Sequence, residues 1–292
     1  MKLLLLSFSF IFILLNSQIV IAEPNYNAED FTFDPTTSTL VPKFMGKVML
    51  IRGKVFATSD QGRRQLSKGQ KIYKKDTVST TKNGIVKIEL VDQTIITLNK
   101  NSEFNVSKWK YIPQKGERDA IINLLRGHMR THFKVKAQKR NKLEVRVNNV
   151  SMAVRGTKVL ANARTDSVGR EITQIALIEG YGHLFDQNNE KQANITTGDH
   201  YISVIGPSVT KTKMDKIPTQ EIKRLLLAGK SPKKDYSFLA NYDITKMGIV
   251  NNSPSNGGYK KIKNKKAGKG TKQEKWKETM QKLNQKLDEY KD

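Results

Sequence analysis

Short runs in which apolar and polar residues alternate dominate residues 44–206 of the chain. In residues 85–90, Val86, Ile88 and Leu90 share one face of an extended strand, and the residues between them are charged. A period of two is the repeat of a strand with one buried face, whereas a helix needs apolar residues at spacings of three and four. The pattern therefore predicts a half-buried β-strand at this position.

Comparable runs recur along the same region, rich in β-branched residues and closed by Gly, Asn or Asp. They are residues 46–51, 54–57, 94–98, 143–147 and 175–178. Many short strands at close spacing predict a mainly β fold, an antiparallel or stacked β-sandwich or β-roll. Residues 117–126 fit either a helix or a strand that ends at Gly127.

The segments on either side of this β region have different patterns. Residues 23–43 are polar and contain Pro24, Pro35 and Pro42, which predicts an extended leader. Residues 207–247 are predicted as a short helical extension.

The helix of this extension is expected over residues 219–228. Ile222, Leu225 and Leu226 fall on one face of it, and Gly229 is a natural C-cap.

The C-terminal part divides into a basic linker and a helix. Residues 248–272 begin rich in Asn, Ser and Gly and end in a run with seven lysines and no acid, which predicts a disordered linker. Residues 273–292 carry an apolar stripe at helical spacing, which predicts an amphipathic helix. The stripe consists of Trp276, Met280, Leu283, Leu287 and Tyr290. Its length favours docking on the β region or on a partner over pairing with a second copy.

The first 22 residues have the design of a secretory signal peptide. Lys2 precedes an apolar run over residues 3–15, and a polar segment leads to a small residue, Ala22, before Glu23. The run is short of the roughly 20 residues that a spanning helix needs, so cleavage is favoured over an uncleaved anchor. We therefore expect a periplasmic or secreted protein with no transmembrane span after cleavage.

The charge and the cysteine content limit which reactions and which partners are expected for this chain. The chain has a formal net charge of +25 and no cysteine, which excludes disulfides and thiolate chemistry. Such a charge predicts attraction to polyanions, although a lysine-rich composition without a dedicated partner explains it too. The candidate anion-binding residues are Lys134, Lys136, Lys139, Arg140, Lys260, Lys261, Lys263, Lys265, Lys266 and Lys269. An exported protein has envelope polymers or proteins as partners, so no natural nucleic-acid target is expected.

Residues that resemble catalytic or metal-binding signals lack the required context. Residues 267–271 resemble part of a phosphate-binding loop, but its first glycine is replaced by Lys263 and no strand precedes it. His128 and His132 share a face without a third ligand, which predicts two solvated histidines in a basic strand. The nucleophile motif Gly-x-Ser-x-Gly is absent. We therefore expect no enzyme activity, cofactor or metal.

Short motifs rich in Gly, Asp and Thr follow one another along residues 46–199. They are Gly46-Lys47-Val48, Leu66-Ser67-Lys68-Gly69, Lys75-Asp76-Thr77-Val78-Ser79-Thr80, Asp92-Gln93-Thr94, Leu124-Leu125-Arg126-Gly127, Val154-Arg155-Gly156-Thr157, Ile178-Glu179-Gly180 and Thr197-Gly198-Asp199. This order resembles the FecR-like periplasmic domain family. Lys75 and Gln93 stand where the family has Gly, so both turns are expected to be less tight.

The resemblance implies a β-rich domain over residues 44–206 with mostly structural motif residues. These residues are Asp76, Asp92, Arg155, Gly156, Thr157, Glu179 and Gly180. Arg155 has Asp92 and Glu179 as candidate partners.

The resemblance also bears on signalling. Characterised members of the family relay a periplasmic signal to a cytoplasmic sigma factor through an N-terminal domain and a transmembrane helix. Only Met1 and Lys2 precede the apolar run here, so the anti-sigma role is not expected.

Three functions follow from these observations. The first is an exported binding or sensing module, in which the β domain recognises a protein or envelope ligand and the basic tail tethers it to an anionic surface. The second is a structural envelope protein bound to cell wall or lipopolysaccharide. The third, a glycan-acting hydrolase, requires a concave site with convergent carboxylates.

Overall fold

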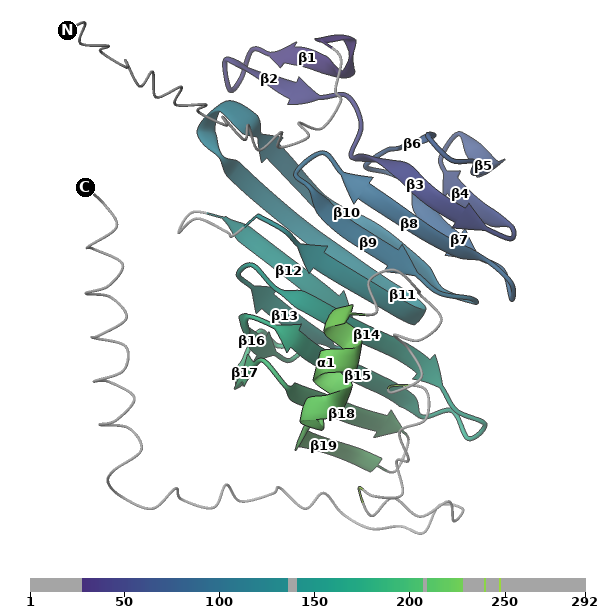
Figure 1. Cartoon of the computed structure of the whole chain (residues 1–292), viewed down its shortest axis with the longest axis vertical. Coiled ribbons are helices and arrows are strands. Elements are labelled where there is room, and N and C mark those ends of the chain that lie inside the picture. The colour runs from purple at the N-terminus through teal and green to yellow at the C-terminus, as the bar shows by residue number, and fades with distance from the viewer. Residues whose placement is uncertain (1–27, 136–140, 207–208, 228–238, 240–246, 248–292) are drawn as a thin grey trace, which may run out of the picture. The chain divides into compact units, whose positions relative to one another are not determined.

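The computed structural model describes residues 28–135, 141–206 and 209–227, together with 239 and 247. All of them belong to one compact unit within residues 1–253 (Figure 1). The described part is mostly antiparallel β-structure, which confirms the predicted fold class. The predicted signal peptide, linker and C-terminal amphipathic helix lie outside the described residues.

Seventeen strands form one hydrogen-bonded network that contains two ladders, here called sheet I and sheet II. Sheet I contains, in spatial order, β6 (Lys71–Ile72), β3 (Gly46–Arg52), β8 (Ile85–Leu90), β9 (Thr94–Leu98), the second half of β11 (Glu117–Phe133), β14 (Lys158–Thr165), β15 (Glu171–Glu179), β18 (Asp199–Gly206) and β19 (Val209–Lys216). Sheet II contains β5 (Gly62–Gln65), β4 (Val55–Ser59), β7 (Thr77–Thr80), β10 (Glu103–Ile112), the first half of β11, β12 (Lys142–Val147), β13 (Val150–Val154), β16 (Tyr181–Phe185) and β17 (Lys191–Thr196). Every pairing in these two ladders is antiparallel except β11 with β12.

Strand β11 joins the two sheets. Its residues before Gly127 pair with β10 and β12, and its residues from Gly127 onward pair with β9 and β14. Gly127 has φ +83°, and a Cβ there would lie 2.3 Å from the Ser102 Oγ. The segment 117–126 is therefore a strand, but the prediction that it ends at Gly127 was wrong, because the glycine lets the strand pass into the other sheet.

The main hydrophobic core lies between the sheets. Val86, Ile88 and Leu90 of sheet I are fully buried, and they share one apolar cluster with Val145 and Val147 of sheet II. Burial on alternate residues of both sheets is what the period of two predicted.

A helix covers the other face of sheet I. Helix α1 (Thr219–Leu227) lies over β14, β15 and β18 (Figure 1) and confirms the predicted helix. Leu225 is fully buried against Leu160, Ala176 and Ile178, and Ile222 packs at the edge of this cluster. Strand β15 is consequently buried on both faces, which explains the uninterrupted apolar run over residues 175–178.

The predicted extended leader differs from the structure. A 3₁₀ turn, η1 (Ala28–Asp30), precedes a hairpin of β1 (Phe31–Asp34) and β2 (Thr39–Pro42). Asp34 organises the turn, because its carboxylate accepts a 3.0 Å hydrogen bond from the Thr36 amide and a 2.9 Å bond from the Thr37 hydroxyl.

The β domain also extends past residue 206, where the helical extension was predicted to begin. Strand β19 pairs with β18 over its whole length. Its alternation of Val, Thr, Lys and Met lacks a continuous apolar face, so the pattern alone did not mark it as a strand.

Candidate functional site

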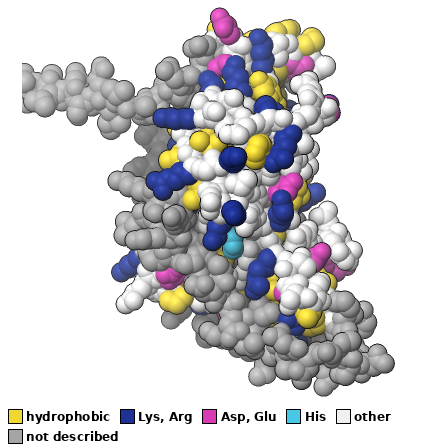
Figure 2. Space-filling model, turned by 90° about the vertical axis from the view of Figure 1, so that its right-hand side faces the viewer, with side chains coloured by type: hydrophobic (Ala, Val, Ile, Leu, Met, Phe, Trp, Pro, Cys, Tyr) yellow, Lys and Arg dark blue, Asp and Glu magenta, His cyan; other side chains and the backbone are white. Residues whose placement is uncertain are grey.

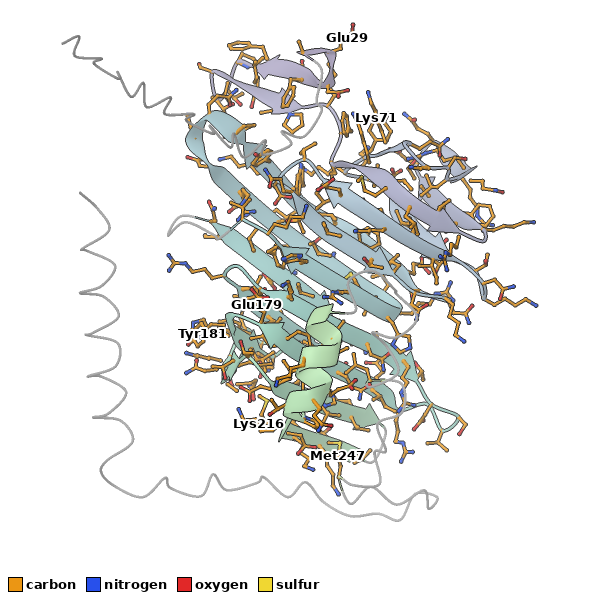
Figure 3. All side chains as sticks on the ribbon, viewed as in Figure 1. Glu29, Lys71, Glu179, Tyr181, Lys216 and Met247 are labelled. Atoms are coloured by element: carbon orange, nitrogen blue, oxygen red, sulfur yellow. The ribbon has the colours of Figure 1, made fainter. Side chains whose placement is uncertain are left out.

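A half-open groove of about 370 Å³ lies where the β1–β2 hairpin meets β10 and the start of β3. The hairpin end of the unit is the one that carries Glu29 and Lys71 (Figure 3). Aromatic and cationic side chains share the lining. The aromatic and charged lining residues are Asp34, Lys43, Phe44, Lys74, Trp109, Lys110 and Tyr111.

A bulge in β10 sets the aromatic wall of the groove. Val106 pairs with Ile122 and Lys108 with Ile121, so one extra residue of β10 is accommodated at this point. The shift turns Trp109 toward the same side as the core, and Tyr111 follows two residues later. Their ring centroids lie 6.4 Å apart at an angle of 47°. Trp109 is partly buried against the main core, and this contact fixes the position of the aromatic wall formed by Trp109 and Tyr111.

Residues 28–43, which contain η1, β1 and β2, are here called the hairpin arm. Asp30 attaches this arm to sheet I beside the groove. Its carboxylate forms ion pairs of 3.1 Å with Lys47 and 2.9 Å with Lys71. Both ammonium groups also lie over the Phe44 ring, 5.2 and 4.8 Å from its centroid. Burial opposes ionisation of Asp30, but the hydrogen bonds from Lys71 and Lys47 outweigh it and lower its pKa.

The rim of the groove carries both signs of charge. Lys43 and Lys74 are exposed, and Lys110 forms a 3.1 Å ion pair with Glu117. The hydrogen bonds from the side chains of Thr36 and Thr37 lower the pKa of Asp34, so this carboxylate stays ionised at neutral pH.

A buried ion pair supports the wall from inside. Arg118 faces Tyr111 across the β10–β11 pair, and its guanidinium lies 3.3 Å from the Asp92 carboxylate. The same guanidinium donates a 2.6 Å hydrogen bond to the Val135 carbonyl. Burial, together with the Asp92 carboxylate, raises the pKa of Tyr111, so its phenol stays neutral and able to donate. The motif residue Asp92 thus lies one layer behind the groove.

The acidic motif residues act in turns. Asp92 accepts hydrogen bonds of 3.0 Å from both the amide and the hydroxyl of Thr94, and Asp76 accepts one of 2.8 Å from Arg64. Gln93 has φ +66°, so the turn keeps its left-handed residue although the glycine is missing. Lys75, the other departure, does not adopt a positive φ.

The remaining motif residues form two adjoining turns. Gly156 and Gly180 have φ of +63° and +106°, and a Cβ on Gly180 would lie 2.8 Å from the Gly156 carbonyl oxygen. Glu179 pairs with Lys158. The described contacts therefore give Asp92 and Glu179 the partners Arg118 and Lys158, while Arg155 is exposed.

Thr157 is buried between these two turns. The two turns pack closely, and none of their motif residues belongs to the lining of the groove.

Of the predicted anion-binding residues, the structure describes only Lys134. It is exposed at the end of β11 and forms a 2.9 Å ion pair with Glu89. Lysine and arginine side chains are spread over the face of the unit in Figure 2 rather than gathered in one patch. Lys136, Lys139, Arg140 and the six lysines of residues 260–269 lie outside the described residues.

The two neighbouring histidines are half-buried, whereas the prediction was two solvated side chains. They share the outer face of sheet I, where burial and the nearby Arg164 lower the pKa of His128 to about 4. Burial, with Lys158 and Arg130, lowers the pKa of His132 to about 4 as well. Within the described ranges, no cluster of three metal-ligating side chains occurs.

Sequence reasoning missed the groove. Its aromatic pair was visible as Trp109-x-Tyr111 with a period of two, but nothing local indicated that residues 34–45 would lie opposite it. Among the described residues, no helix has the length and apolarity needed to cross a membrane.

Comparisons with known proteins found a family model and solved structures that are similar to parts of this chain. The family model described as FecR protein matches residues 76–181. No curated protein matches the chain. Two crystal structures described as a "putative anti-sigma factor" from Parabacteroides distasonis are each 13% identical to this chain with a TM-score of 0.39. Each comparison covers 52% of this chain and 65% or 64% of the other, less than two thirds of its length. The resemblance to the FecR family is therefore shown by the match of its model to residues 76–181.

Proposed function

We propose that this protein is an exported, non-enzymatic binding and sensing module of the cell envelope, periplasmic or secreted. The observation that carries the proposal is the groove beside Trp109 and Tyr111, which combines aromatic walls with a charged rim. Concave sites of this kind, mostly apolar with a few placed polar groups, are the usual form of ligand sites. The FecR match over residues 76–181 supports a sensing role.

Binding fits the groove better than catalysis. A glycan-acting hydrolase needs two convergent carboxyl groups, and among the described lining residues Asp34 is the one carboxylate. Its lowered pKa makes it a poor proton donor at neutral pH. The lining therefore supplies recognition groups without an acid–base pair.

The basic tail is proposed as an electrostatic tether. Residues 260–269 hold six lysines, whose charge favours adsorption to an anionic surface. A purely structural envelope role, with the tail as the main binding element, is the second candidate.

Photo-crosslinking tests the groove as a binding surface. A photo-reactive amino acid replaces Val41 of β2, a half-buried lining residue without charge, in the full chain, and a matched control carries it at the exposed Val168. We expect adducts with envelope components at position 41 and none at 168. Trp109→Ala should abolish the adducts, and Tyr181→Ala, an exposed aromatic outside the groove, should leave them intact. Equal adducts at both positions, or adducts that persist in Trp109→Ala, would reject the proposal.

A further inference from the structure

We infer that the groove binds an acidic saccharide, a sugar chain that carries carboxylate or phosphate groups. The inference rests on the proposed function, because it names the ligand class of the same groove. Three features of the lining carry it: aromatic rings, ammonium groups, and one carboxylate that stays ionised.

The aromatic wall suits the apolar face of a sugar ring. Trp109 and Tyr111 stand side by side on one strand, tilted by 47°, and the largely buried Phe44 also belongs to the lining. Large aromatic side chains bury much apolar area while keeping one polar end in water. The neutral Tyr111 hydroxyl is available to hydrogen-bond, as the ring oxygens and hydroxyls of a sugar require.

The cations specify negative charge on the ligand. Lys43, Lys74 and Lys110 line the groove, and an ammonium group binds carboxylate or phosphate as a point charge with three donors. Lys110 is partly neutralised by Glu117 at 3.1 Å. Lys43 and Lys74 therefore supply most of the attraction for an anion.

Asp34 distinguishes a saccharide from a simple anion. Its ionised carboxylate accepts hydrogen bonds but donates none, so the group beside it must be a donor. A ligand that places hydroxyls at Asp34 and anionic groups at Lys43 and Lys74 satisfies both ends. The volume of about 370 Å³ falls within the range of about 300–1,000 Å³ that is common for small-ligand sites.

Calorimetric titration of the full mature chain tests the inference. The probes are a trigalacturonate, its methyl ester, a phosphorylated glucosamine disaccharide and its dephosphorylated form. We expect at least one acidic probe to bind about tenfold more tightly than its neutral counterpart. Comparison of the two acidic probes identifies carboxylate or phosphate as the preferred group.

Variants locate the binding in the groove. Lys43→Gln with Lys74→Gln, both at exposed positions, should weaken the acidic probe at least about fivefold, whereas Lys68→Gln, exposed and outside the groove, should not. Asp34→Asn should weaken the neutral counterpart through loss of the charged hydroxyl acceptor. It should weaken the acidic probe less, because the substitution also removes a negative charge that repels an anion.

Several results would overturn the inference. They are equal affinity for acidic and neutral probes, unchanged affinity in the lysine double variant, and tighter binding of an oligoglutamate peptide than of either acidic sugar. If these occur while Trp109-dependent crosslinks at position 41 persist, the ligand class is wrong but the groove remains the binding surface. Loss of those crosslinks as well would reject both proposals.

Discussion

At the scale of single residues, the hydrogen bonds and the ion pair that Asp92 forms explain why the motif has an aspartate at this position. Asp92 is 2% exposed and ties the β8–β9 turn to Arg118, which is 4% exposed. Two charges taken out of water are tolerated only when each compensates the other. The pair also stands behind Tyr111, so a motif with a structural role supports the groove wall.

Breaking this pair on one side should be costly. Asp92→Ala leaves the Arg118 guanidinium buried without its carboxylate, and we expect a loss of about 3–5 kcal/mol in the free energy of unfolding. Urea denaturation measures it. The matched control is Asp60→Ala, which removes an exposed ion pair with Lys75 and should produce no measurable change. Equal effects of the two substitutions would contradict the structural role of Asp92.

Gly127 offers a second test, because Gly169 has nearly the same φ angle and serves as its control. Gly127 and Gly169 have φ of +83° and +79°, but a Cβ has open space only at Gly169. Gly169→Ala should therefore cost about 1 kcal/mol from backbone strain alone. Gly127→Ala should cost about 1–3 kcal/mol more, because its Cβ would overlap the Asn101 carbonyl and Ser102. Thermal unfolding compares the two, and equal losses would show that the strand crossing tolerates a side chain.

At the scale of elements, the hairpin arm depends on one carboxylate. Lys47 and Lys71 both pair with Asp30, and the Lys43 amide donates a 2.9 Å hydrogen bond to the Asp30 carbonyl. The arm supplies Asp34 and Lys43 to the groove, so its attachment determines whether the groove exists.

The lowered pKa of Asp30 gives the attachment a pH dependence. A carboxylate with a folded pKa below its unfolded value, about 3.9, stabilises the fold above that value and ceases to do so as the pH falls through the folded pKa. We therefore expect the protection factors of β1 and β2 amides, each measured relative to the intrinsic exchange rate at the same pH, to fall below about pH 4, whereas those of β8 stay high. Asp30→Asn should show the lowered protection already at pH 7. An arm that stays protected in this variant would mean that other contacts hold it.

At the scale of the whole molecule, the net charge of +25 is distributed between the β domain and the C-terminal segment. Figure 2 shows basic side chains spread over the domain, while residues 260–269 concentrate six lysines in ten positions. A dense run of like charge binds an anionic surface more strongly than the same charge spread over a globular face. More of its charges can lie within the screening length of the surface at the same time.

Neutralising this run should therefore release the protein from anionic surfaces. Substitution of all six lysines of residues 260–269 by Gln in the full chain should weaken binding to phosphatidylglycerol vesicles about tenfold and flatten its dependence on salt. Sedimentation with the vesicles measures the bound fraction, and neutral vesicles are the control. Undiminished, equally salt-dependent binding would place the attraction on the β domain.

The sequence by itself determined the features that depend on neighbours along the chain. Alternation placed Val86, Ile88 and Leu90 in the core, three- and four-residue spacing placed α1, and the order of Asp, Gly and Thr motifs indicated the FecR family. These signals are local because the burial of one face repeats with the period of the element that carries it.

The tertiary structure alone decided which distant segments meet. It placed residues 34–45 beside Trp109 and Tyr111 to form the groove, gave Asp92 the partner Arg118, and carried β11 through both sheets. The pattern of apolar residues along the chain shows which side chains are buried, but it does not show which distant residues they contact. The choice among alternative apolar surfaces and charge partners is made by the packing free energy of the whole domain.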